Sequence, residues 1–352
     1  MNTEQIILNK ERNVTLTACL QPAGGEFYHI AKRPAILVLP GGGYTMCSDR
    51  EADPVALPYL AAGYQVFILH YSVGMDAIWP NPLMDYEAAM ELIRKNAKKW
   101  ELYEDKIAVI GFSAGGHLAG CAATMAQNRP NAAILGYAAV DGATIQAYHP
   151  TAPDVISAVS DDTCPCFVFS SRTDNMVPVR NSVNMIQALT EHDISYECHI
   201  YGHGPHGFST CNSVTQTPGT GFSNRIPHWV EDSIAWLKDI FGDFGMGAMT
   251  APACGKHING NKDAFLNADC TVAYLLQNEA ASRIISPLMD ASRQSFENYM
   301  PDSSKLAPEE PRMDPAMLMQ TMTLREILGY GQTTPEVIEQ FDAQLKQIPN
   351  SK

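Results

Sequence analysis

The chain has 352 residues, of which 45% are hydrophobic and 18% are charged, and its formal net charge is −14. This composition is typical of a folded globular protein and excludes a disordered or fibrous chain. The excess of negative charge disfavours nucleic acids and anionic lipid surfaces as partners, because their phosphate groups would repel it.

The nine cysteines have neither the spacing of a disulfide framework nor that of a zinc site. Their odd number indicates reduced thiols and an intracellular protein. The first residues lack a basic start followed by an apolar segment, so no signal peptide is predicted. No apolar run approaches the ~20 residues that a membrane span needs. We therefore expect a cytoplasmic protein without a metal.

Taken in chain order, the predicted elements begin with two short strands, 4–9 and 14–20, which form an edge hairpin. Strands and helices then alternate, with strands expected at 34–39, 65–71, 106–110, 132–139, 165–170 and 196–201, and helices at 52–62, 81–100, 179–192 and 226–241. Such alternation predicts βαβ units and a mostly parallel sheet. In such sheets ligands bind beyond the C-terminal ends of the strands.

The composition changes after this region, which predicts a domain at 1–245, a linker rich in small residues at 246–262 and a helical module at 263–352. Helices in the module are expected at 271–277, 279–291, 315–320, 324–328 and 335–348, with a loop at 301–317. A capping-box pattern, Thr323 with Glu326, marks one helix start. Three roles stay open for the module: closing over a pocket, forming a homodimer, or binding glycan.

Residues 111–115 read Gly-Phe-Ser-Ala-Gly and directly follow the expected strand 106–110. This G-x-S-x-G pattern is the sharp strand-to-helix turn that lifts a serine hydroxyl above a sheet. Side chains two residues before and after the serine would collide there, and glycine avoids the collision. The pattern therefore predicts Ser113 as a nucleophile. The alternative is a glycine-rich turn that only packs.

A serine nucleophile needs hydrogen-bond donors where negative charge develops on the substrate. Residues 40–44, Pro-Gly-Gly-Gly-Tyr, follow the strand 34–39, where a glycine-rich donor loop belongs. We expect the backbone N–H groups of Gly42, Gly43 and Ala114 to form this oxyanion hole. A flexible glycine turn is the alternative.

The serine also needs a base, and the base needs an acid that orients it. The loop after the last strand offers His203 and His206 as bases. Asp174, after the strand 165–170, fits the acid best, and Asp141 is its rival. The chain order serine, aspartate, histidine is the order of such triads on a strand-turn-helix scaffold.

Other residues near these motifs fit less well. His117 lies one helical turn past Ser113 and cannot easily return to its hydroxyl, so we expect a packing role. Tyr44, Met75 and Trp79 lie in loops, where they either shape the pocket or pack.

Four motifs carry a family resemblance: Leu-Pro-Gly-Gly-Gly-Tyr at 39–44, Gly-Phe-Ser-Ala-Gly-Gly-His-Leu at 111–118, Thr-Asp-Asn-Met-Val-Pro at 173–178 and His-Gly-Phe at 206–208. Over residues 30–241 the chain resembles the α/β-hydrolase esterase/lipase family, and most nearly the bacterial acetyl xylan esterase and feruloyl esterase-like carbohydrate esterases. One departure is Pro40, where many relatives have a histidine that braces the loop.

The resemblance implies an α/β-hydrolase fold, with helices on both faces of the sheet and Ser113, Asp174 and His206 as the catalytic triad. It further implies a serine esterase that removes small acyl groups, above all acetyl, from sugar hydroxyls of an oligosaccharide or small molecule. No cofactor or metal is expected. Alternatives are a feruloyl or other short-chain esterase, a prolyl-oligopeptidase-type peptidase, and a ligand-binding protein on an inactive hydrolase scaffold.

Overall fold

The computed structural model describes residues 1–286, 288, 322–330 and 333–350. The chain divides into two compact units, Met1–Lys256 and His257–Lys352. The division of the sequence at 1–245, 246–262 and 263–352 stays a prediction. None of the helices in the described ranges combines the length and the apolar character needed to cross a lipid bilayer.

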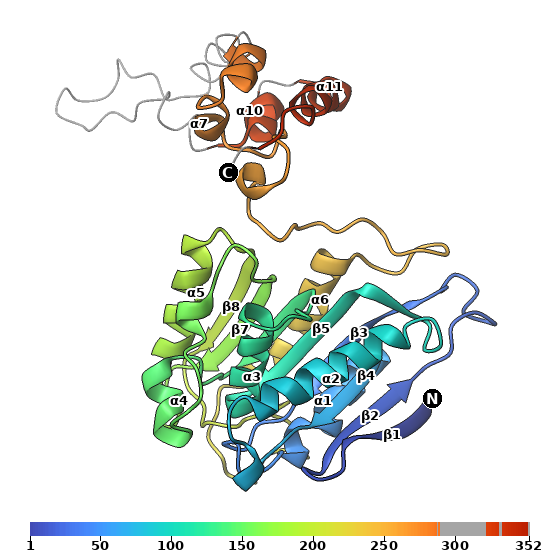
Figure 1. Ribbon diagram of the computed structural model, residues 1–352, viewed down its shortest axis with the longest axis vertical. Helices are drawn as coiled ribbons and strands as arrows, with labels where there is room; N and C mark the ends of the chain where they lie inside the picture. Colours follow the sequence, from blue (N-terminus) through green and yellow to red (C-terminus); the bar gives the residue numbers. More distant parts are fainter. Residues whose placement is uncertain (287, 289–321, 331–332, 351–352) are drawn as a thin grey trace, which may run out of the picture. The chain divides into compact units, whose positions relative to one another are not determined.

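The first unit is built on one eight-stranded sheet, whose strands lie in the order β1-β2-β4-β3-β5-β6-β7-β8. The strands are β1 (Asn2–Asn9), β2 (Val14–Leu20), β3 (Arg33–Leu39), β4 (Gln65–His70), β5 (Leu102–Phe112), β6 (Ala132–Gly136), β7 (Cys166–Ser171) and β8 (Tyr196–Tyr201). The pairs β1–β2 and β2–β4 are antiparallel, and each pair from β4 across to β8 is parallel. The predicted edge hairpin and mostly parallel sheet are confirmed (Figure 1).

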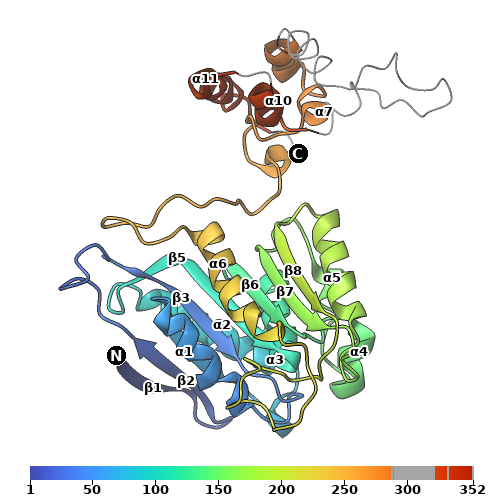
Figure 2. The ribbon, with the colours of Figure 1, turned by 180° about the vertical axis from the view of Figure 1, so that it is seen from behind.

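Helices cover both faces of this sheet (Figures 1 and 2). On one face, α2 (Asn81–Lys95), α3 (Ser113–Thr124) and α5 (Arg180–Glu191) bury side chains in a common apolar core. On the other, α1 (Asp53–Ala61) and α6 (Trp229–Phe241) contribute to a second core. The structure also has short 3-10 helices: η1 (Asp49–Glu51), η2 (Gly74–Asp76), η3 (Ile156–Ala158), η4 (Ile226–His228) and η5 (Gly260–Lys262).

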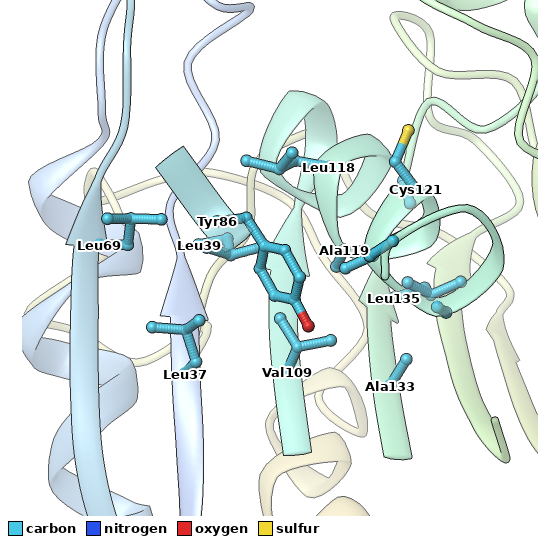
Figure 3. Close-up of a cluster of buried hydrophobic side chains, with 14 of the residues drawn as sticks. Leu37, Leu39, Leu69, Tyr86, Val109, Leu118, Ala119, Cys121, Ala133 and Leu135 are labelled. Carbon is cyan, nitrogen blue, oxygen red and sulfur yellow. The ribbon is translucent and has the colours of Figure 1, made fainter. Parts of the chain in front are cut away.

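The central strand β3 shows why its sequence is apolar without a break. Leu37 and Leu39 face the core under α2 and α3, whereas Ile36 and Val38 face the opposite core, and all four are fully buried. Figure 3 shows the first of these cores, where the Tyr86 ring lies among side chains of neighbouring strands. A parallel strand covered on both faces needs apolar side chains in both directions, which removes the alternation seen at a sheet surface.

The segment between β6 and β7 differs from the sequence-based expectation in two ways. The strand expected at 132–139 ends at Gly136, because Tyr137 turns the chain with a φ of 34°. A helix that the sequence analysis did not predict, α4 (Gly142–Tyr148), then begins. Asp141 caps it, since its side chain accepts hydrogen bonds from the N–H groups of Ala143 and Thr144.

The second unit has its own small apolar core, which α7 (Val272–Leu275), α10 (Leu324–Tyr330) and α11 (Pro335–Leu345) share. Thr323 and Glu326 exchange hydrogen bonds at the start of α10, which confirms the predicted capping box. Residues 279–286 are helical. The remainder of the expected helix 279–291 apart from residue 288, the helix expected at 315–320 and the loop at 301–317 lie outside the described residues.

Candidate active site

Ser113 stands on a sharp turn at the end of β5, where its φ is 53°. A side chain at Gly111 would place its Cβ 2.0 Å from the carbonyl oxygen of Gly115. A Cβ at Gly115 would lie 2.2 Å from the carbonyl oxygen of Leu39. Real Cβ atoms do not approach so closely, so both positions require glycine. The geometry predicted from the G-x-S-x-G pattern is therefore present, and it lifts Ser113 to the first position of α3.

The hydroxyl of Ser113 lies against the imidazole of His206, although 93 residues separate them in the sequence. The distance from Ser113 Oγ to His206 Nε2 is 2.8 Å, and His206 Nδ1 lies 2.7 Å from Asp174 Oδ2. A carboxylate can only accept, so Nδ1 carries the proton and Nε2 is free to accept from the serine hydroxyl. The tautomer is thus the one that a general base needs.

Backbone N–H groups hold the Asp174 carboxylate on the side away from the imidazole. Its other oxygen, Oδ1, accepts hydrogen bonds of 2.9 Å from the N–H groups of both Met176 and Val177. The Asp174 side chain is fully buried, and that of His206 is 11% exposed. These bonds fix the carboxylate in the one direction from which it can orient the imidazole.

The loops that carry the acid and the base are fastened to each other. Ser171 Oγ donates to the Gly204 carbonyl oxygen over 2.7 Å, and the N–H of Gly204 donates to Thr173 Oγ1 over 3.0 Å. Gly204 lies two residues before His206, and Thr173 lies one residue before Asp174. The contact between the two functional side chains therefore rests on a backbone that is already joined.

The rival residues occupy other places. The carbonyl of His203 accepts from the N–H of Ser223, and the imidazole that contacts Ser113 is that of His206. Asp141 caps α4 instead of orienting a histidine.

His117 is fully buried in the helix after the serine. Its Nε2 lies 2.8 Å from the Pro153 carbonyl oxygen, which can only accept, so Nε2 carries the proton. Nδ1 then accepts from the Tyr44 hydroxyl over 2.7 Å. Burial lowers the pKa of His117 to about 4. These contacts agree with the expected packing role.

The expected oxyanion donors lie beside the serine. Gly42, Gly43 and Ala114 line the same pocket as Ser113. Within the described residues, the N–H groups of Gly42 and Gly43 donate to no other group of the chain. Ala114 lies in the first turn of α3, where a backbone N–H has no helical acceptor. All three N–H groups are therefore available to a substrate oxygen.

The loop that carries these glycines is braced without the histidine that Pro40 replaces. The Tyr71 hydroxyl donates to the Pro40 carbonyl oxygen over 2.5 Å. The N–H of Gly41 donates to Glu51 Oε2 over 2.8 Å, and Glu51 is only 3% exposed. The sequence analysis missed Glu51, because no local pattern distinguishes a buried glutamate from an exposed one.

The pocket above Ser113 has a volume of about 440 Å³. Its wall is partly apolar and partly polar, and includes Thr45, Met46, Ser48, Arg50, Ile145, Tyr148, Met176 and Val177. Tyr44, Met75 and Trp79 are not part of this lining. Of the two roles left open, packing holds for Tyr44, which belongs to the buried core, whereas Met75 is 93% exposed. No group of three or more potential metal ligands occurs within the ranges that the structure describes.

Among known proteins, the BD-FAE family model matches residues 28–146 of this chain. The sequence is 39% identical to that of MGS-M1, an α/β-hydrolase enzyme from a Medee basin deep-sea metagenome library. The crystal structure of MGS-M1 matches the fold with a TM-score of 0.63. That match covers 68% of this chain and 98% of the other.

Two curated relatives are similar over part of their length. One is endo-1,4-beta-xylanase B of Butyrivibrio fibrisolvens, 31% identical over 51% of this chain and 33% of that protein. The other is an acetylxylan esterase of Xylanibacter ruminicola, 28% identical over 58% of this chain and 45% of that protein. The chain thus spans less than half of the length of either relative.

Proposed function

This chain belongs to the α/β-hydrolase esterase/lipase family, and from that premise we propose that it is a serine carboxylesterase. Its substrates are esters of small acyl groups, above all acetyl, on sugar hydroxyls. The observation that carries the proposal is the hydrogen-bonded series of Ser113, His206 and Asp174, in the same pocket as the backbone of Gly42, Gly43 and Ala114.

The first half of the reaction forms an acyl-enzyme. Ser113 Oγ attacks the ester carbonyl carbon while its proton passes to His206 Nε2. The negative charge that develops on the carbonyl oxygen is met by the N–H groups of Gly42, Gly43 and Ala114, each worth about 100- to 1,000-fold in turnover in comparable enzymes. The proton on Nε2 then passes to the leaving alcohol oxygen as the bond from that oxygen to the acyl carbon breaks.

The second half releases the acid and restores the enzyme. A water molecule attacks the acyl carbon and gives a proton to His206 Nε2, which returns it to Ser113 Oγ as the acyl bond breaks. Throughout both halves, Asp174 keeps the imidazole in the tautomer whose Nε2 faces the serine, and it stabilises the imidazolium when that forms.

The substrate class is inferred from the pocket and from the relatives. A volume of about 440 Å³ suits a small ligand rather than a polymer segment buried along its length. The side chains of Thr45, Ser48 and Arg50 offer polar contacts to sugar hydroxyls, and the half-exposed ring of Tyr148 offers a flat apolar surface. Relatives named for xylanase and acetylxylan esterase activities support an acylated xylose-containing substrate.

A fluorophosphonate probe and a substrate panel test the proposal. The wild-type protein is expected to be labelled, and Ser113→Ala is not. Ser48→Ala is the control and is expected to be labelled, because it removes another hydroxyl from the same pocket and leaves Ser113 in place. The panel compares p-nitrophenyl acetate, acetylated xylo-oligosaccharides, feruloyl esters and dipeptide amides. Undiminished labelling of Ser113→Ala contradicts the nucleophile. Hydrolysis of feruloyl esters or amides alone contradicts the acetyl assignment but not the serine chemistry.

A further inference from the structure

Glu51 lies behind the catalytic residues, and we propose that it is a positioning residue. It fastens the oxyanion loop, residues 40–44, to the histidine loop, the segment after β8 that carries His206. The inference rests on the proposed esterase function and adds a residue to it. Glu51 ends the short helix η1, and its carboxylate reaches into the buried space between the two loops.

One carboxylate oxygen holds the oxyanion loop. Glu51 Oε2 accepts from the N–H of Gly41, which directly precedes the two glycines proposed as donors. A Cβ on Gly41 would lie 2.6 Å from Glu51 Oε2 and 3.1 Å from Ser113 Cβ. The carboxylate therefore lies directly behind the point where loop and nucleophile meet, and its position sets that of Gly42 and Gly43.

The other oxygen reaches the histidine loop through a tyrosine. Glu51 Oε1 lies 2.6 Å from the Tyr137 hydroxyl oxygen, which also accepts from the N–H of Ser209 over 3.0 Å. The hydroxyl proton must then point at Glu51. The Tyr137 ring meets the ring of His206 edge to face, with the centroids 5.1 Å apart. A shift of Glu51 would therefore move both the ring that supports the base and the backbone beyond it.

The neighbouring residue binds the same loop directly. The Arg50 guanidinium donates to the Gly207 carbonyl oxygen, and the Arg50 carbonyl oxygen accepts from the Ser209 hydroxyl. The helix η1 thus binds the histidine loop at two residues that follow His206, Gly207 and Ser209, while Glu51 binds the oxyanion loop at Gly41.

A carboxylate suits this place because both of its partners are donors. Glutamine would turn its own N–H₂ toward one of them and lose that hydrogen bond. Burial raises the pKa of Glu51, and the bonds from Tyr137 and Gly41 and the charges of His206 and Arg50 offset this rise only in part.

The test compares Glu51→Gln with Asp49→Asn, because Asp49 is an exposed carboxylate of the same helix η1. On p-nitrophenyl acetate we expect Glu51→Gln to lower kcat about 10- to 100-fold with KM little changed, since the donors are displaced rather than removed. Asp49→Asn is expected to keep the wild-type kcat and KM.

A second variant keeps the test decisive if Glu51→Gln does not fold. Tyr137→Phe removes the link to the histidine loop and leaves the bond to Gly41, so a lowered kcat is expected there too. Wild-type kcat in folded Glu51→Gln would refute the inference, as would wild-type kcat in Tyr137→Phe. An unlabelled, inactive wild-type protein would instead refute the proposed function.

Discussion

Asp141 and Asp174 follow neighbouring strands of the sheet, β6 and β7, and their carboxylates have different hydrogen-bond partners. Asp174 Oδ2 lies 2.7 Å from the imidazole of His206, whereas Asp141 Oδ1 accepts from the N–H groups of Ala143 and Thr144 at the start of α4. One aspartate is placed to orient a base, and the other stabilises a helix.

This difference predicts opposite outcomes for the same substitution. Asp174→Asn is expected to lower kcat by about 10⁴-fold with little loss of stability, because the amide favours the wrong imidazole tautomer. Asp141→Asn keeps a good N-cap and is expected to keep kcat, whereas Asp141→Ala costs about 1 kcal/mol of unfolding free energy. Ester hydrolysis and urea denaturation measure both. A large loss of kcat in Asp141→Asn would argue against Asp174 as the acid.

Gly115, two residues after the serine, predicts that a larger side chain at this position lowers the stability of the protein. Gly115→Ala places a Cβ 2.2 Å from the Leu39 carbonyl oxygen, so the turn must open, at a cost of about 1–3 kcal/mol or more. The matched control is Gly202→Ala, because a Cβ there meets nothing within 4 Å and the residue is exposed. Thermal unfolding checks both variants. An equal melting temperature for Gly115→Ala and the wild type would mean that the turn is looser than described.

The buried His117 predicts a dependence of stability on pH. Its pKa falls from an ordinary 6.5 to about 4, because a charged imidazole would lose its water in the core. Between these two pKa values the unfolded chain therefore carries a proton on His117, whereas the folded protein does not. The unfolding free energy has its full value with respect to this group above pH 6.5, and it decreases as the pH falls toward 4, by up to about 3 kcal/mol.

Urea denaturation between pH 7 and 4 measures this loss in the wild type and in His117→Gln. A glutamine amide can donate to the Pro153 carbonyl oxygen and accept from the Tyr44 hydroxyl, as the neutral imidazole does. We expect the variant to lose less stability over this range than the wild type. Equal slopes in the two proteins would exclude His117 as a source of acid sensitivity.

The separate apolar cores predict that the first unit is sufficient for ester hydrolysis. The residues of the small C-terminal core lie between Leu266 and Leu345, and the two cores on the sheet lie within Met1–Lys256. A protein of residues 1–256 is therefore expected to fold cooperatively and to hydrolyse p-nitrophenyl acetate as the full chain does. Loss of folding or of activity on truncation would show that the second unit completes the first.

The same truncation addresses the roles left open for the second unit. Comparing both proteins on acetylated xylo-oligosaccharides and by sedimentation distinguishes the alternatives. A loss confined to oligosaccharides favours glycan binding, and a change in mass beyond the deleted residues favours dimerisation.

Much of the fold followed from local patterns. The apolar run at 106–110 and the G-x-S-x-G pattern after it predicted a strand, a turn and a helix, and all three are present. The helix α4 was missed because its seven residues carry too little periodicity, although Asp141 before Gly142 was a usable N-cap signal. Of the two roles left open for Tyr44, packing holds, because its hydroxyl turns inward to His117, and a loop position by itself does not reveal burial.

The sequence by itself determined the sheet, the serine turn and the loops that carry the candidate acid and base, because strand periodicity and glycine sterics act over a few residues. Tertiary structure alone brought the imidazole of His206 against the hydroxyl of Ser113 and gave Glu51 its partners, since both depend on how loops far apart in the chain pack together. Hydrogen-bond direction and burial are properties of that packing, and no short stretch of sequence encodes them.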